Sequence, residues 1–195
     1  MRMKNRYQAI VIGASAGGTI ALQKILPFLP AEFPMPVIIA QHLHPLQDGA
    51  AIIHYNGGGA LIVKDADEKE SLHAGFVYFA PPNYHLLIED DHTFSLSVDA
   101  KVHYTRPSVD VLFESAADAY GTGLIGIILS GANQDGADGL LRIKQKGGLT
   151  VVQDPQDAEV SYMPQTAVET ARPDHILTAD EICKFLIELT LQRVP

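Results

Sequence analysis

Short apolar runs and helical stripes alternate along most of the chain. The run Gln8–Ile12 is compact and β-branched, it stops at Gly13, and apolar residues then recur at helical spacing over Thr19–Leu29. Val37–Ala40 is a second run of the buried type. A strand, a tight turn, a helix and a further strand predict a βαβ unit with parallel pairing and a right-handed crossover.

The middle of the chain has a different pattern, because strand-like runs follow one another with only short polar connections. Gly75–Ala80, Tyr84–Glu89 and Thr93–Val98 are each separated by three residues, which predicts hairpins. Before them, Gln41–Asn56 is less regular and leads to the glycines 57–59, a predicted break. We therefore expect an antiparallel excursion in the middle of the fold.

Alternation of helices and strands returns in the second half. A helix is predicted to start at Pro107, Leu124–Leu129 is a strong strand, and the loop Ser130–Gly136 leads to another helix. Leu149–Gln153 predicts one more strand. The whole pattern predicts a single domain over residues 1–195, with an α/β fold: a doubly wound, mainly parallel sheet with helices on both faces and an antiparallel hairpin at one edge.

Composition supports a folded domain and narrows its partners. Of the 195 residues 47% are hydrophobic and 19% charged, which is globular composition, and the formal net charge is −9. This acidic balance, without a Lys/Arg cluster, disfavours nucleic acid and anionic membranes as partners. The basic N-terminus precedes an apolar run that is too short to act as an export signal or to span a membrane, so we predict no targeting segment and no membrane insertion.

Cysteine usage adds a constraint. Cys183 is the sole cysteine, so the chain can form neither an internal disulfide nor a Cys-based zinc site. We expect the reducing cytosol as its compartment.

The first predicted strand ends in Gly13-Ala14-Ser15-Ala16-Gly17-Gly18, which holds Gly-x-Ser-x-Gly between a strand and a helix. In a nucleophile elbow, small neighbours let the serine occupy a strained turn, and the next backbone N–H is free to stabilise an oxyanion. A dinucleotide-binding turn is the alternative. Against it, the second strand ends in Gln41-His42 without a ribose-binding acid, and no tyrosine is followed four residues later by lysine.

Two further polar residues end strands that are expected to meet Ser15 at one sheet edge. His42 directly follows the second strand, where it can act as general base. Asp135, in the loop after the strand Leu124–Leu129, can orient the imidazole and stabilise its protonated form; the alternative is a cap on the following helix. His42 with His44 lacks a third metal ligand and no calcium loop is complete, so we predict no metal and no other cofactor.

Six motifs carry a resemblance that covers nearly the whole chain. They are Ile12–Gly18, Gln41-His42, Ala80–His85, Arg106–Phe113, Ser130–Ala137, and Gln153-Asp154-Pro155 with Tyr162-Met163-Pro164. In this order they resemble the catalytic domain of the chemotaxis protein-glutamate methylesterase (CheB) family, and Arg106–Phe113 is the most specific piece.

The resemblance implies a cytoplasmic serine hydrolase that removes methyl groups from glutamate methyl esters on chemoreceptor helices and can deamidate certain receptor glutamines. It implies Ser15 as nucleophile, His42 as base and Asp135 as orienting acid. Backbone N–H groups at Ala16 and Ala132 are then the expected oxyanion donors, and Arg106 is a candidate substrate-binding residue.

The chain departs from the family pattern at several positions. Ala16 replaces the usual Thr, Gly131–Gly136 reads Gly-Ala-Asn-Gln-Asp-Gly instead of Gly-Met-Gly-Asn-Asp-Gly, and Leu43-His44-Pro45 replaces Met-Pro. The family's receiver domain does not precede the first strand, so we expect a stand-alone, constitutively competent enzyme. The alternatives are an esterase or amidase with another substrate, and a non-catalytic interaction domain of the same fold.

Overall fold

The computed structural model describes residues 6–42 and 59–191. Its strands are β1 Ala9–Ala14, β2 Val37–Gln41, β3 Ile62–Asp65, β4 Phe76–Phe79, β5 His85–Ile88, β6 Phe94–Ser97, β7 Leu124–Ile128, β8 Leu149–Gln153 and β9 His175–Leu177. Its α-helices are α1 Gly18–Ile25, α3 Val109–Tyr120, α4 Ala137–Gln145, α5 Tyr162–Ala171 and α6 Ala179–Leu191. Short 3-10 helices follow α1 and α3, at Leu26–Phe28 and Gly121–Gly123.

Seven strands form one parallel sheet in the order β3-β4-β2-β1-β7-β8-β9. The chain builds β2, β3 and β4 on one side of β1, and β7, β8 and β9 on the other. The direction of winding therefore reverses at β1. In open α/β sheets, ligands bind outside the carboxyl ends of the strands at such a switch point, which here means the ends of β1, β2 and β7.

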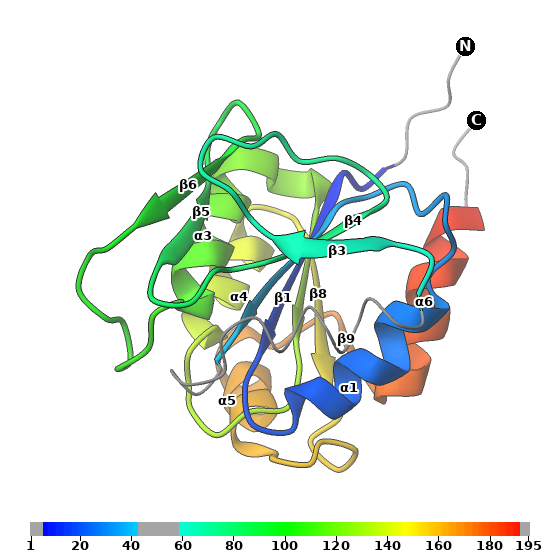
Figure 1. The fold of residues 1–195 in the computed structure, drawn as a ribbon. Helices are drawn as coiled ribbons and strands as arrows, with labels where there is room; N and C mark the ends of the chain where they lie inside the picture. The colour runs from blue at the N-terminus through cyan, green and yellow to red at the C-terminus, as the bar shows by residue number, and fades with distance from the viewer. Residues whose placement is uncertain (1–5, 43–58, 192–195) are drawn as a thin grey trace.

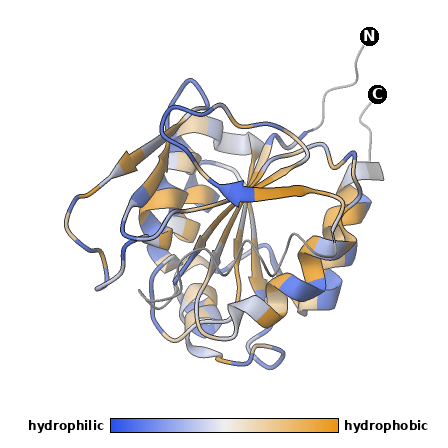
Figure 2. Ribbon diagram, in the orientation of Figure 1, coloured by the Kyte–Doolittle hydropathy of each residue, from blue (hydrophilic) through white to orange (hydrophobic). Residues whose placement is uncertain are grey.

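Helices cover both faces of this sheet, with α1 and α6 on one face and α3, α4 and α5 on the other (Figure 1). Every residue of β1 is buried, and its side chains alternate: Ile10 and Ile12 face the first layer, Ala9 and Val11 the second. Figure 2 shows largely hydrophobic central strands, whereas α1 and α6 alternate between hydrophobic and hydrophilic residues. The predicted doubly wound fold is confirmed.

The predicted hairpins need a correction. The sequence pattern pairs Gly75–Ala80 with the run after it, but β4 lies in the parallel sheet between β2 and β3. Its residues Val77, Tyr78 and Phe79 are all buried, as expected for a parallel strand covered on both faces. Strands β5 and β6 do pair antiparallel, yet they form a two-stranded sheet of their own against α3 instead of an edge of the main sheet.

Helix α6 completes the first layer. Ile182, Cys183 and Leu186 are buried against the sheet, and the Cys183 thiol lies 3.8 Å from the carbonyl oxygen of Ile25. Across the described ranges, no helix combines the length and apolar character that crossing a bilayer requires.

Candidate active site

Ser15 is the first residue after β1 and begins the turn to α1. Its N–H donates to the carbonyl oxygen of Ser130 and its own carbonyl accepts from Gly18, both at 2.9 Å. Gly17 completes the turn with φ of +75°, a left-handed conformation that costs glycine little. A Cβ built on Gly131 would lie 3.0 Å from the Ser15 Cβ, so the loop after β7 packs directly against the turn.

The buried Ser130 side chain ties this turn to the segment before α5. Its hydroxyl donates to the carbonyl oxygen of Ala16 at 2.7 Å and accepts the Val160 N–H at 2.9 Å. Its own N–H donates to the Gln153 side-chain oxygen at 2.9 Å. Sequence reasoning missed this residue, because a serine after a strand carries no signal that sets it apart from an ordinary loop serine.

His42 follows β2 and reaches the same sheet edge. The register of β1 and β2 pairs Ala14 with Gln41, and the His42 N–H donates to the Ala14 carbonyl oxygen at 3.0 Å. Ser15 and His42 are therefore the next residues of two adjacent strands, which lie about 4.8 Å apart. The His42 side chain is 10% exposed.

Asp135 is fully buried and surrounded by donors. His42 Nε2 lies 2.8 Å from its Oδ2. Four further donors point at the carboxylate: Thr105 Oγ1 at 3.1 Å, Ser108 Oγ at 2.8 Å, Val109 N at 2.7 Å and Asp110 N at 3.0 Å. Burial raises the pKa of Asp135, but the hydrogen bonds from His42 and from the Asp110 and Val109 N–H groups outweigh it and hold the pKa at about 2.

The two backbone donors come from the first turn of α3, so Asp135 caps a helix that is distant in sequence. The helix that follows it, α4, begins after Gly136 with no side-chain cap. The alternative interpretation, a cap on the following helix, is therefore wrong. At the start of α3 the helix dipole also favours the negative charge of the carboxylate.

A catalytic triad would join Ser15 to His42 and His42 to Asp135 by hydrogen bonds. The structure has the bond between His42 and Asp135, but none between the side chains of Ser15 and His42. Among the described residues, the Ser15 hydroxyl makes no hydrogen bond. His42 Nδ1 instead lies 3.2 Å from the side-chain nitrogen of Asn133. Because Nε2 faces Asp135, Nδ1 is the ring nitrogen that a base for Ser15 would use, and Asn133 contacts this same nitrogen. Asn133 had no predicted role from the sequence. Its departure from the family pattern was the one feature that could have drawn attention to it.

Ala16 and Ala132, the expected oxyanion donors, flank this edge. Both residues are exposed. Within the described residues neither backbone N–H is used in a hydrogen bond. Both groups are thus free to bind an oxyanion, and that role stays a prediction.

Arg106 has a structural partner. Its NH1 group donates to the carbonyl oxygens of Val98 at 2.6 Å and Asp99 at 2.9 Å, which holds the segment between β6 and α3 together. A contact between Arg106 and substrate stays a prediction. His44 and the rest of the irregular segment 43–56 lie outside the described residues, as do the glycines 57 and 58.

His103, Asp110 and Asp138 form the one described group with metal-ligand chemistry, since one ligand atom from each lies within 4.8 Å of the others. His103 Nε2 lies 3.2 Å from Asp110 Oδ2, and Asp110 Oδ1 accepts the Gly139 N–H at 2.7 Å. Both oxygens of the buried carboxylate thus have protein partners, and we assign no metal here. Burial raises the pKa of Asp110 to about 6, and the neighbouring Asp135 carboxylate adds to the rise.

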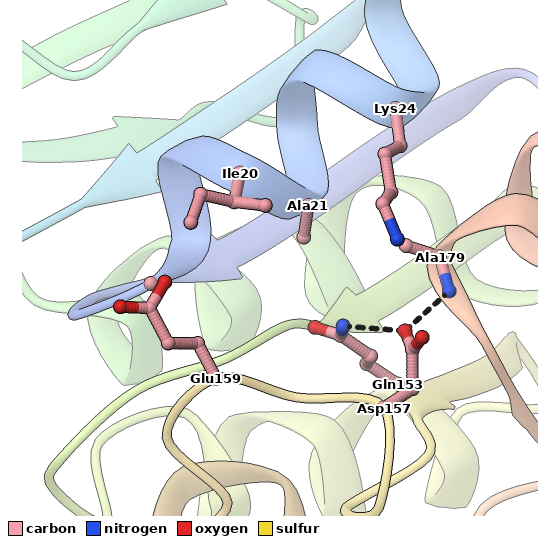
Figure 3. Close-up of a pocket in the computed structure, with 8 residues that line it drawn as sticks. Ile20, Ala21, Lys24, Gln153, Asp157, Glu159 and Ala179 are labelled. Carbon is pink, nitrogen blue, oxygen red and sulfur yellow. Dashed lines mark hydrogen bonds between the residues drawn. The ribbon is translucent and has the colours of Figure 1, made fainter.

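A pocket of about 200 Å³ lies on the α1 side of the turn that carries Ser15 (Figure 3). In Figure 3, Asp157 accepts hydrogen bonds from the Gln153 side chain and the Ala179 N–H, each 2.8 Å long, and Glu159 lies beside the start of α1. Because Gln153 also accepts from Ser130, this pocket wall supports the turn that carries Ser15. Its lining residues are Gly17, Ile20, Ala21, Lys24, Gln153, Asp157, Glu159 and Ala179.

A family model described as CheB methylesterase matches residues 10–186. The chain belongs to the CheB methylesterase family. A relative in Leptospira interrogans, named "Putative protein-glutamate methylesterase/protein-glutamine glutaminase", is 50% identical over 183 residues, which cover 94% of this CheB-family chain and 95% of that protein. The Thermotoga maritima protein-glutamate methylesterase/protein-glutamine glutaminase is 34% identical over 92% of this chain and 53% of its own length.

The CheB fold is confirmed in three dimensions. The crystal structure of the Thermotoga maritima CheB methylesterase catalytic domain matches with a TM-score of 0.90 at 34% identity, over 94% of this chain and 98% of that one. The chain therefore spans about half of the Thermotoga maritima relative and nearly all of the Leptospira one. The resemblance read from the motifs is confirmed, and with it the class of carboxylic ester hydrolase.

Proposed function

We propose that this chain is a protein-glutamate methylesterase that demethylates glutamate methyl esters, and deamidates glutamines, on the cytoplasmic helices of methylated chemoreceptors. One observation carries the proposal: in a CheB-family chain, His42 lies 2.8 Å from the buried Asp135 carboxylate, directly beside Ser15 at the switch point of the sheet. The cytoplasm is the compartment where such receptor helices are reached.

The reaction is acyl transfer through Ser15. The Ser15 hydroxyl attacks the ester carbonyl while His42 Nδ1 takes its proton, and Asp135 stabilises the resulting imidazolium. Free N–H groups at Ala16 and Ala132 bind the oxyanion of the tetrahedral intermediate. His42 then gives the proton to the leaving oxygen, which departs as methanol, or to the leaving nitrogen of a glutamine, which departs as ammonia, as the carbonyl–heteroatom bond breaks. Water attacks the acyl-enzyme with His42 as base, which releases the glutamate carboxylate and restores Ser15.

The site is open, which suits a side chain presented by a folded partner. Ser15 is half-buried, whereas Ala16 and Ala132 on either side are exposed. A long glutamyl side chain can reach such an edge from a helix surface without the helix unfolding. A closed pocket would instead select small free esters.

The proposal is tested by methanol release from methylated receptor fragments. We expect Ser15→Ala to remove nearly all release with the fold intact, as judged by circular dichroism. Ser161→Ala is the matched control, because Ser161 is exposed and its hydroxyl has no partner among the described residues; it is expected to match wild type. Full release by Ser15→Ala would exclude Ser15 as nucleophile. Hydrolysis of a simple ester without methanol release from receptor fragments would favour another substrate.

A further inference from the structure

Asn133 bridges the proposed base and the proposed acid. Its side-chain nitrogen lies 3.2 Å from His42 Nδ1, and its side-chain oxygen accepts the Asp135 N–H at 3.3 Å. The loop that delivers the carboxylate to one ring nitrogen therefore also delivers an amide to the other. Asn133 is half-buried, so both contacts are partly shielded from water.

These contacts determine which way the amide points. The Asp135 N–H can only donate, so the Asn133 atom that faces it has to be the oxygen. The NH₂ group then faces His42 Nδ1. An amide flip would set two donors against each other at Asp135, which makes the orientation a consequence of the network.

The amide orientation in turn determines the state of the imidazole. A nitrogen that accepts from an NH₂ group carries a lone pair, so Nδ1 is unprotonated and the ring proton is on Nε2, where it is donated to Asp135. We infer that Asn133 is a positioning residue for the catalytic base: it fixes the His42 ring in the tautomer with its proton on Nε2, and its NH₂ group occupies the Nδ1 lone pair until the Ser15 hydroxyl takes its place. The inference rests on the proposed function for the role of His42 as base.

Protonation of His42 breaks this arrangement. Once Nδ1 carries a proton, that N–H faces the NH₂ group of Asn133, and no amide orientation satisfies both His42 and the Asp135 N–H. Asn133 therefore stabilises the neutral base relative to the imidazolium.

Few other charges act on His42. Asp135 is the one charged side chain in contact with the imidazole in residues 6–42 and 59–191. From the segment before α3, Thr105 and Ser108 contribute only uncharged hydroxyls, both to Asp135. Behind them Asp110 meets the Asp135 carboxylate through its backbone N–H and is paired with His103.

The same loop offers a matched control. Gln134, the next residue, contacts a different histidine, with its side-chain nitrogen 3.2 Å from His103 Nδ1. Gln134→Ala therefore removes an amide–imidazole contact of the same length from the same loop without touching His42. The position of Asn133 is a glycine in the family pattern, which has no side chain to make the contact.

The first experiment reads the tautomer without any activity. ¹⁵N NMR of the wild-type chain near neutral pH is expected to show His42 with an unprotonated Nδ1 and a protonated Nε2. Asn133→Asp keeps an acceptor for the Asp135 N–H and replaces the donor facing Nδ1 by a second carboxylate, so His42 is expected to carry protons on both nitrogens. A wild-type Nδ1 that is protonated, or an Asn133→Asp spectrum identical to wild type, would overturn the inference.

The second experiment is the pH dependence of kcat/KM for ester hydrolysis. Loss of one neutral hydrogen bond in Asn133→Ala is expected to shift the acidic limb of this pH profile to higher pH by about half to one unit. Asn133→Asp is expected to shift the limb further in the same direction. Gln134→Ala is expected to keep the wild-type limb. A limb unmoved in Asn133→Ala, or moved equally by Gln134→Ala, would contradict the role.

The two experiments separate the inference from the proposed function. A chain that releases no methanol but shows the expected tautomer refutes the function and keeps the arrangement of Asn133. If wild type releases methanol but Asn133→Ala leaves the acidic limb of the pH profile unmoved, the proposed function stands and the role of Asn133 is refuted. A purely structural role of Asn133 in the loop would lower the rate at every pH without moving the limb, and circular dichroism of both variants identifies a folding defect.

Discussion

The Asp135 carboxylate accepts the backbone N–H of Val109 at 2.7 Å, so the residue that orients His42 also fixes the start of α3. Ser108 adds its hydroxyl to the same carboxylate at 2.8 Å. The proposed catalytic role and the stability of the fold therefore depend on the same buried side chain. A change at Asp135 is expected to affect both, whereas a change at one of its neutral donors affects stability alone.

Asp135→Asn tests this coupling. An amide has one acceptor oxygen, and its NH₂ group would face the donors of α3 or of His42. We expect methanol release to fall by about 10³- to 10⁴-fold, because the imidazolium loses its carboxylate, and the free energy of unfolding to fall by about 1–3 kcal/mol. Thr105→Val is the control: it removes one neutral donor, costs about 1 kcal/mol and keeps most of the activity. Wild-type kinetics in Asp135→Asn would exclude an orienting role.

Ionisation of the buried Asp110 carboxyl destabilises the native state, and this effect depends on pH. The pKa of this carboxyl is raised by burial from the ordinary 3.8 to about 6, so between these values the native state binds more protons than the unfolded state. Stability then falls as pH rises through this window. Asp110→Asn removes the ionisation and can still accept the Gly139 N–H, so the variant is expected to gain stability relative to wild type between pH 4 and pH 8.

Urea denaturation of both chains at the two pH values measures this gain. The unfolded carboxyl and the native one are both largely ionised at pH 8, where the full penalty applies to wild type only. A difference between variant and wild type that is the same at both pH values would show that ionisation of Asp110 does not affect folding.

Gly131 controls the space behind Ser15, the proposed nucleophile. A methyl group there would lie 2.2 Å from Met163 Sδ and 3.0 Å from Ser15 Cβ. Gly131→Ala is expected to displace Ser15, to lower methanol release and to destabilise the chain by about 1–3 kcal/mol. In the double variant with Met163→Ala the closest contact is absent, so its stability loss is expected to be smaller than the sum of the two single losses. Strict additivity in this cycle would refute the contact.

The apolar runs predicted most of the sheet, because strands of a parallel sheet are covered on both faces and are apolar throughout, as β1 and β2 are. The same rule explains the error at β4. An apolar run followed by a short polar connection is compatible with a hairpin or with a parallel strand, and only the partner strands, β2 and β3, decide between them.

For the candidate site, too, the sequence predicted what depends on the strands and missed what depends on contacts between loops. Ser15 and His42 were found because each directly follows a strand, and Asp135 because it lies in the loop after one; the strand ends of a parallel sheet meet at one edge. The contacts of Asn133 and Ser130 were not, since they depend on which loop atom meets which across the fold. Local capping rules predicted that Asp135 caps the next helix, α4. The backbone N–H groups that donate to Asp135 belong instead to α3, more than twenty residues earlier.

The central claim is that Ser15 forms the acyl-enzyme, and trapping that intermediate tests it most directly. Wild-type chain mixed with a glutamate methyl ester peptide and quenched in acid during turnover is analysed by peptide mass mapping, with methanol release followed in parallel. We predict an adduct of the peptide minus methanol on the fragment that carries Ser15, and neither adduct nor methanol from Ser15→Ala. An adduct on another residue, or sustained methanol release by Ser15→Ala, would contradict the claim.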